Sequence, residues 1–278
     1  GVYLLQPALP IRFSDYALPA GTLFLTAAAW YFTRDRDASA QPQTRRENFI
    51  ALALMMVLSL GVALARFLPP EVRFTPSRPP DPFHITLMIA LGALLVFGAS
   101  WVTRGMSVKR LMTALILLMI GLFIALKFEP LAVEIARLWR SATEQDVTVA
   151  SLIDLNWLGF SYVAFRLIHT LRDRQTGLLP ALTLREYVTY VVFFPALIAG
   201  PIDRAERFQK DFIALPTLNG MDAARWQIGL VRIAFGLFKK FVIADTLAQG
   251  MALDPRLANL AVSTPYTWIL VYGYALRL

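Results

Sequence analysis

Residues 49–68 read FIALALMMVLSLGVALARFL, a run of twenty residues in which Arg66 is the single charged side chain. An apolar helix of about twenty residues is long enough to cross the hydrocarbon core of a bilayer. A proline-rich stretch at residues 69–82 follows, and a helix cannot continue through it. The pattern predicts a transmembrane helix bounded on its C-terminal side by a loop.

Four further apolar runs carry the same signal. They lie near residues 16–33, 83–102, 111–128 and 152–171. The whole sequence is 57% hydrophobic and 17% charged. A soluble domain needs about a quarter of its residues charged, whereas the outer face of a membrane bundle is solvated by lipid. We therefore predict an all-α, polytopic helical membrane protein, with residues 1–278 forming one transmembrane domain.

Lysine and arginine are distributed unevenly over the loops between these runs. The loops after the first, third and fifth runs are richer in them than the loops after the second and fourth. Positive residues are enriched in cytoplasmic loops, so the richer loops are expected to lie in the cytoplasm. The richer loops carry Arg34, Arg36, Arg45, Arg46, Arg104, Lys109, Arg110, Arg172 and Arg174, and the poorer loops carry Arg73, Arg78, Arg137 and Arg140.

Residues 187–202 depart from this regular pattern. The stretch is apolar, but it has only sixteen residues and contains Pro195 and Pro201. A full crossing would put the basic residues that follow it on the side opposite to the other basic loops. We therefore predict a re-entrant or half-depth helical segment that returns to the cytoplasmic side. Irregular backbone at membrane depth is tolerated where protein buries it or where it lines a cavity.

The last part of the chain contains two more apolar stretches. Residues 222–249 are expected to form a buried helix that begins at Asp222, a residue type favoured at helix N-termini. The run at residues 265–278 has only fourteen residues, fewer than a crossing needs. Together with a first residue, Gly1, that is not methionine, this predicts an incomplete domain that is truncated at its C-terminus.

The composition excludes several kinds of site. There is no cysteine and there are only two histidines, His84 and His169, so a metal site is not expected. The net charge of +8 lies in short clusters between apolar runs, which is not the continuous basic surface of a nucleic-acid-binding protein. Glycine-rich phosphate loops and the G-x-S-x-G elbow of hydrolases are also missing.

Three stretches stand out as motifs. Residues 157–169 read WLGFSYVAFRLIH, residues 193–204 read FFPALIAGPIDR, and residues 236–245 read GLFKKFVIAD. In this order the chain resembles the membrane-bound O-acyltransferase (MBOAT) family, in its bacterial branch that modifies cell-envelope polymers. The second stretch, with Arg207 and Phe208 after it, is similar to the D-alanyl transferase members, and the third to the alginate O-acetyltransferase-like members. The resemblance covers about residues 156–278.

This resemblance implies an acyl transfer across the cell (inner, cytoplasmic) membrane by a multi-pass protein. The acyl donor would be a cytoplasmic thioester, either acyl-CoA or an acidic acyl carrier protein, with no bound cofactor. The acceptor would be a hydroxyl of an exported glycan or teichoic-type polymer. The family's central catalytic histidine is expected beyond residue 278. No catalytic residue is therefore expected in this chain, and the chain alone is expected to be inactive.

Five charged residues are candidates for binding the donor: Asp203, Arg204, Arg207, Lys239 and Lys240. Arg204 and Arg207 follow the half-depth segment, and Lys210 comes soon after, so the three cations offer a face for an acidic donor. A purely structural role is an equally strong interpretation: Asp203 can pair with Arg207, and Glu206 with Lys210, across one helical turn. Lys239 and Lys240 allow the same two interpretations, and a lysine pair that reaches toward water at a helix end is the simpler one.

The candidates for a tunnel or for the re-entrant turn are Arg166, His169, Pro195, Gly200 and Pro201. Arg166 and His169 lie three residues apart within the fifth run, and polar groups inside a membrane usually face the bundle interior. His169 also lies near the cytoplasmic end of the run, where it could simply reach toward water. A polytopic transporter or flippase without acyltransferase activity is the alternative, because intramembrane Arg166 and a broken helix would suit a substrate pathway too.

Overall fold

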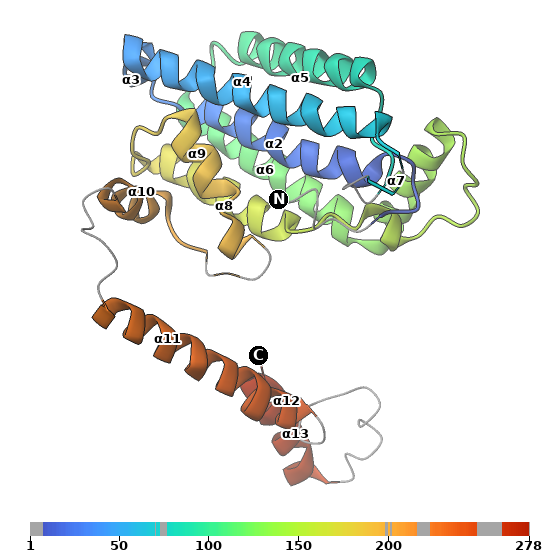
Figure 1. Ribbon diagram of the computed structural model, residues 1–278, viewed down its shortest axis with the longest axis vertical. Coiled ribbons are helices and arrows are strands. Elements are labelled where there is room, and N and C mark those ends of the chain that lie inside the picture. Colours follow the sequence, from blue (N-terminus) through green and yellow to red (C-terminus); the bar gives the residue numbers. More distant parts are fainter. Residues whose placement is uncertain are drawn as a thin grey trace. The chain divides into compact units, whose positions relative to one another are not determined.

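The computed structural model describes residues 8–69, 71–72, 77–197, 200, 202–215, 223–248 and 263–277. Within these residues the secondary structure is entirely helical, which confirms the predicted all-α fold class. The chain divides into two compact units, Gly1–Ile213 and Ala214–Leu278. Figure 1 shows both, and each is described by itself below.

The first unit is a bundle of long helices joined by short ones. Helices form where four of the five main runs were predicted: α2 (Ser14–Thr33), α4 (Pro42–Leu64), α5 (Pro82–Val102) and α6 (Val108–Lys127). The short elements between and after these helices are α3 (Arg36–Ala40), η1 (Ala65–Phe67) and α7 (Glu129–Ala142). The unit continues with η2 (Leu152–Leu155), α8 (Phe160–Thr176), α9 (Leu184–Val191), η3 (Phe194–Ala196) and α10 (Ala205–Ala214).

The predicted continuous helix at residues 152–171 is wrong at its start. The 3-10 turn η2 ends at Leu155, and α8 begins only at Phe160. Gly159, between them, has a φ of 73°, a left-handed conformation that glycine adopts without strain. A Cβ at Gly159 would also lie 3.0 Å from the carbonyl oxygen of Leu197. The break thus lets a segment forty residues later approach the start of α8.

Three helices of the described residues are long and apolar enough to cross a membrane: Pro42–Phe67, Pro82–Val102 and Val108–Lys127. Most of their side chains are exposed, including Phe49 and Leu95, as expected for surfaces that lipid solvates. Helices α2 and α8 are shorter or more polar, but they supply buried polar groups such as Thr26 and Arg166. Protein atoms surround these two helices, so their polar groups need not face lipid.

The core of this unit forms where α8 meets α2, α6 and α9. Phe160, Val163 and Leu167 of α8 are buried against Met112 of α6 and Tyr187 of α9. This packing lets α9 rest on helices that come from much earlier in the chain. The core therefore positions the segment that the sequence marked as irregular.

The bundle has two distinct ends. At one end the Arg174 side chain donates to the Arg34 carbonyl (3.4 Å), and Gln175 donates to the Lys109 carbonyl (3.3 Å). The three loops predicted to share one side of the membrane are thus brought together. In Figure 1 this end, with α3, α9 and α10, lies at the left, and α7 lies at the opposite end.

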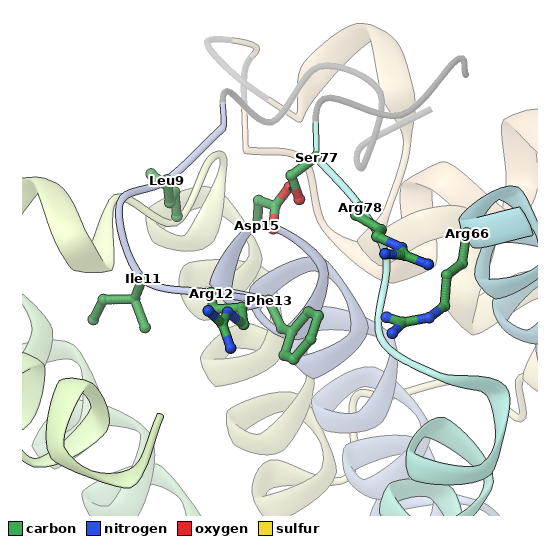
Figure 2. Close-up of a pocket in the computed structure, with 8 residues that line it drawn as sticks. All are labelled: Leu9, Ile11, Arg12, Phe13, Asp15, Arg66, Ser77 and Arg78. Carbon is green, nitrogen blue, oxygen red and sulfur yellow. Dashed lines mark hydrogen bonds between the residues drawn. The ribbon is translucent and has the colours of Figure 1, made fainter. Parts of the chain in front are cut away.

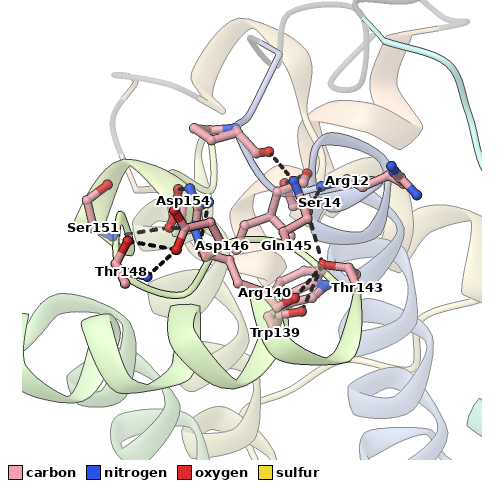
Figure 3. Close-up of polar contacts among 12 residues, drawn as sticks. Arg12, Ser14, Trp139, Arg140, Thr143, Gln145, Asp146, Thr148, Ser151 and Asp154 are labelled. Carbon is pink, nitrogen blue, oxygen red and sulfur yellow. Dashed lines mark hydrogen bonds and ion pairs between the residues drawn. The ribbon is translucent and has the colours of Figure 1, made fainter.

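A buried ion pair organises the α7 end (Figure 3). Arg140 of α7 donates from Nε and Nη2 to the two carboxylate oxygens of Asp154 in η2, both at 2.7 Å. The Ser151 backbone N–H donates to the same carboxylate at 3.1 Å. Gln145 joins this end to the start of the chain, because it donates to the Pro10 carbonyl and accepts from the Arg12 N–H. Asp154 therefore lies in a short turn that pairs with α7, and not in a membrane-spanning helix.

The second unit consists of α11 (Ala223–Phe238), the π-helix η5 (Lys239–Ala244), α12 (Asp245–Ala248) and α13 (Thr264–Arg277). Asp222, the predicted helix start, lies outside the described residues. Within this unit nearly all the described side chains of residues 223–248 are exposed. The burial predicted for residues 222–249 stays a prediction, because the two units are not placed relative to one another. A helix that is apolar all round suits either lipid or protein, and hydropathy does not distinguish the two.

Candidate functional site

The predicted half-depth segment is broken into short pieces. Helix α9 has eight residues, a length of about 12 Å at 1.5 Å per residue, which is well short of a bilayer crossing. The 3-10 turn η3 follows, and Pro195 is exposed within it. Pro201 lies outside the described residues.

The chain then returns to the end of the bundle from which α9 started. Gln209 of α10 donates from its side chain to the carbonyl of Ala181, just before α9 (3.2 Å). The Tyr190 hydroxyl donates to the carbonyl of Asp203 at 2.8 Å. The ring of Phe208 lies 5.5 Å from that of Tyr190 and 5.2 Å from that of Phe193. These contacts bring the chain back beside the start of α9, and a re-entrant path through the membrane stays a prediction.

The start of α9 is held by a helix cap and by hydrogen bonds to two helices from earlier in the chain, α4 and α2. Thr183 and Glu186 form a capping box, in which each side chain accepts from the other residue's backbone N–H. Asn48 of α4 accepts from the Leu184 N–H (2.8 Å), and Trp30 of α2 donates to the Leu182 carbonyl (3.0 Å). The entry into the re-entrant segment is therefore fixed to the bundle.

Arg166 of α8 lies beneath the turn that ends α9. Its side chain is buried, and its Nη1 donates to the carbonyls of Tyr190 (3.1 Å) and Val191 (2.9 Å). Its Nη2 donates to the carbonyl of Ala196 at 3.0 Å. The last carbonyls of a helix have no partner within the helix, and a cation there also complements the helix dipole. Arg166 thus satisfies the backbone of a helix that ends inside the protein.

One donor of this buried guanidinium is left over. The Nε atom of Arg166 has no hydrogen-bond partner among the residues the structure describes. The guanidinium carbon also lies 5.8 Å from the centre of the Tyr190 ring. Gly200, a further candidate, is half-buried, and a Cβ added there would overlap Ala196. Arg166 and Gly200 thus both lie close to Ala196 in the turn η3.

The structure does not bring His169 to this site. Arg166 is buried, whereas His169 is exposed, as expected if His169 reaches toward water at the end of the run. Three residues correspond to a rotation of 300°, which leaves the two side chains 60° apart, enough to cross from the interior to the surface.

Thr170, and not His169, is buried on the same side of α8 as Arg166. Its hydroxyl makes a buried hydrogen bond of 2.6 Å with the hydroxyl of Tyr187. Thr170 is four residues after Arg166, and this spacing is the signal that would have found it.

The donor-binding candidates on α10 largely pair with one another. Arg207 lies 3.8 Å from Asp203, and Lys210 lies 2.7 Å from Glu206, which confirms both predicted pairs. The hydrogen bond from Lys210 lowers the pKa of Glu206. All four side chains are solvent-accessible, and exposed pairs of this kind contribute little stability. Arg204 forms no ion pair with any residue of the described parts of the chain.

Lys239 and Lys240 lie in the second unit, so the structure does not place them relative to Arg204. Lys239 lies over the ring of Phe235, 4.9 Å from its centre. Lys240 pairs with Asp245, five residues later. A π-helix forms i to i+5 bonds and therefore brings residues five apart onto one face, which explains this pair between η5 and the first residue of α12.

Comparison with known proteins adds a second line of observation. A teichoic acid D-alanyltransferase of Streptococcus thermophilus is 34% identical over 113 residues, which are 39% of this chain and 26% of that protein. The chain resembles teichoic acid D-alanyltransferases. The enzyme of Lacticaseibacillus rhamnosus is 37% identical over 62 residues, which are 22% of this chain and 15% of that protein. The enzyme of Bacillus subtilis is 33% identical over 129 residues, which are 44% of this chain and 32% of that protein.

The match covers only part of these relatives. At most about a third of each relative's length is matched, so the relatives contain long regions without a counterpart in the alignment. No protein-family model and no solved structure matches the chain. These relatives support the D-alanyl transferase side of the resemblance seen in the motifs.

Proposed function

We propose that this chain is part of a multi-pass acyltransferase of the cell membrane. The enzyme would move a D-alanyl group from a cytoplasmic thioester to a hydroxyl of a teichoic acid on the other side. The observation that carries the proposal is the similarity to three teichoic acid D-alanyltransferases at 33–37% identity. The motif order in residues 157–245 supports it independently.

In this reaction class the acceptor hydroxyl oxygen attacks the carbonyl carbon of the thioester. A carbon–oxygen bond forms, the carbon–sulfur bond breaks, a base takes the hydroxyl proton, and the thiol leaves with a proton. The described residues of this chain would contribute binding and positioning. The re-entrant segment, held by Arg166, would form part of the wall along which the thioester arm enters.

The donor would dock at the end of the bundle that carries α10. An acyl carrier protein and coenzyme A both present negative charge, and the exposed Arg204 and Arg207 offer guanidinium groups to it. The pair between Arg207 and Asp203 is long and exposed, so it would exchange readily for a stronger contact. Arg204 has its side chain free of ion pairs among the described residues and is the principal candidate.

The transporter alternative receives less support from the same geometry. That interpretation needs the buried Arg166 to present its guanidinium to a passing substrate. Both Nη atoms of Arg166 instead donate to backbone carbonyls of the re-entrant segment. These bonds support a role for Arg166 in holding the turn.

The test is complementation of a Bacillus subtilis strain that lacks its teichoic acid D-alanyltransferase, using the full gene product. D-alanine esters on the teichoic acid should be restored, and their absence in a strain that makes and inserts the protein would reject the enzyme. The double reversal R204E/R207E should raise the KM for the D-alanyl carrier protein about tenfold, since each exposed charge contributes up to about 1 kcal/mol.

A matched control is R104E/R110E, which reverses two exposed charges in a neighbouring loop. Its KM for the D-alanyl carrier protein should stay close to the unmodified value. Equal KM values for both double variants would leave Arg204 and Arg207 with a structural role only. A parallel assay with D-alanyl coenzyme A distinguishes the two donor classes.

A further inference from the structure

A cavity of about 390 Å³ lies at the end of the bundle opposite to α10. Its polar lining comes from three arginines, Arg12, Arg66 and Arg78, together with Asp15 and Ser77. Figure 2 shows Arg66 and Arg78 on the same side of this cavity, next to the contact between Ser77 and Asp15. We call it the arginine pocket. None of its residues belongs to the motifs or to the re-entrant segment.

Three separate parts of the chain build this pocket. Arg12 precedes α2, Arg66 lies in η1 after α4, and Arg78 lies just before α5. Each part is tied in place: the Arg12 N–H donates to Gln145 (2.7 Å), and Arg66 Nη1 donates to the carbonyl of Pro79 (2.9 Å). The Ser77 hydroxyl donates to a carboxylate oxygen of Asp15 at 2.5 Å. Hydrogen bonds therefore hold in place the backbone segments that carry the three arginines.

The charge of the pocket is strongly positive. The lining contains three arginines and one carboxylate, that of Asp15, and this carboxylate already accepts a hydrogen bond from Ser77. Within the described residues none of the three arginines forms an ion pair. Arg12 and Arg78 are exposed and can reach a ligand, while Arg66 is half-buried. Arginine binds phosphate through two parallel N–H donors, so this arrangement favours a phosphate-bearing anion.

The location of the pocket indicates which phosphate-bearing molecule it binds. It lies at the end of the bundle away from the basic loops that contain Arg34, Lys109 and Arg174, and this end is extracytoplasmic by the distribution of positive charge. We propose that the arginine pocket binds phosphodiester groups of the acceptor, a polyol-phosphate polymer. This proposal rests on the proposed function, because only an acyl transfer to such a polymer brings it to this side.

The form of the pocket favours the polymer over a lipid headgroup. The arginines surround a cavity whose size is typical of a small-ligand site, instead of forming a row along a lipid-facing helix. Arg12 and Arg78 also lie outside the three helices that could span the membrane. A flexible polymer with a phosphate in every repeat can present one group to this cavity while its neighbours remain in water.

The experiment measures binding directly, without acyl transfer. The full gene product in phosphatidylcholine nanodiscs is titrated with poly(glycerol phosphate) oligomers. The double variant R12Q/R78Q should weaken binding at least tenfold, because the phosphate loses its charge-assisted hydrogen bonds to two guanidinium groups. The control R104Q/R110Q removes the same charge at the other end and should bind as the unmodified protein does. Higher salt should weaken binding to the unmodified protein.

Each outcome has a definite meaning. Equal weakening in R12Q/R78Q and R104Q/R110Q would show a general charge effect and overturn the proposal. Absence of oligomer binding in phosphatidylcholine nanodiscs would overturn it. Oligomer binding that phosphatidylglycerol nanodiscs abolish would assign the pocket to a lipid headgroup and also overturn it. The KM for the D-alanyl donor should stay unchanged in R12Q/R78Q. A failure of the pocket proposal can therefore be distinguished from a failure of the proposed acyltransferase function, which would appear as missing D-alanine esters.

Discussion

Arg166 shows how a single side chain makes an irregular segment stable. A guanidinium buried away from water is unfavourable unless its donors find partners. Its partners here are three carbonyls that the end of α9 and the following turn leave open. The two Nη atoms of Arg166 and these carbonyls satisfy one another, while Nε has no partner among the described residues, so the turn depends on Arg166.

Replacement of Arg166 by methionine keeps most of the volume but removes all donors. We expect R166M to lower the free energy of unfolding by about 3–5 kcal/mol, because three buried carbonyls lose their partner. Hydrogen exchange followed by mass spectrometry should show faster exchange confined to residues 187–197. The control is R172M on the same helix, where the arginine is exposed. Similar exchange in both variants would refute the role assigned to Arg166.

At the scale of elements, the ion pair between Arg140 and Asp154 joins α7 to η2. Burial by itself raises the pKa of Asp154, but the hydrogen bonds from Arg140 and from the Ser151 N–H outweigh it, and the pKa is lowered. The same hydrogen bond raises the pKa of Arg140. Both side chains lie outside the three helices that could span the membrane. The pair thus stabilises the end of the bundle that also contains the arginine pocket.

The lowered pKa of Asp154 predicts the pH dependence of stability. Because the folded value lies below the unfolded value of about 3.9, the contribution is complete above pH 3.9 and is lost as the pH falls through the folded pKa. We expect D154N to lose about 3 kcal/mol at pH 7, since it leaves Arg140 buried without a counter-charge. Denaturant unfolding in detergent at pH 7 and at pH 3 provides the measurement. A stability difference from the unmodified protein that is as large at pH 3 as at pH 7 would contradict this account.

At the scale of the whole first unit, the predicted cytoplasmic loops gather at one end of the bundle. The loops that contain Arg34, Lys109 and Arg174 meet at one end, and α10 joins them through Gln209. The arginine pocket and the Arg140–Asp154 pair occupy the other end. An acyl transfer across a membrane needs such a division, with a donor on one side and an acceptor on the other.

The absence of cysteine from the sequence makes this sidedness measurable. Single cysteines at Val149, Met106 and Asp211 report on the α7 end, on a basic loop and on α10, and all three positions are exposed. In intact cells a membrane-impermeant maleimide should label V149C, whereas M106C and D211C should react only after permeabilisation. External labelling of D211C would mean that the segment before α10 crosses the membrane and is not re-entrant.

Much of the helical layout could be predicted from the sequence alone. Runs such as residues 49–68 specify their environment, because lipid solvation depends on the apolar character of consecutive residues and requires no knowledge of neighbours. The uneven arginines of the loops likewise predicted which connections lie together. The shortness of residues 187–202 and its prolines predicted a broken segment, since too few residues remain for a crossing. The pairs Asp203–Arg207 and Glu206–Lys210 followed from local spacing.

Only the tertiary structure decided the partners of residues far apart in the chain. Arg166 meets carbonyls 24 to 30 residues away, and Arg12, Arg66 and Arg78 meet around one cavity. It also decided that Thr170, and not His169, points inward. Hydropathy describes what solvates a side chain on average. Which group it touches depends on how helices pack, and that is set by the whole bundle.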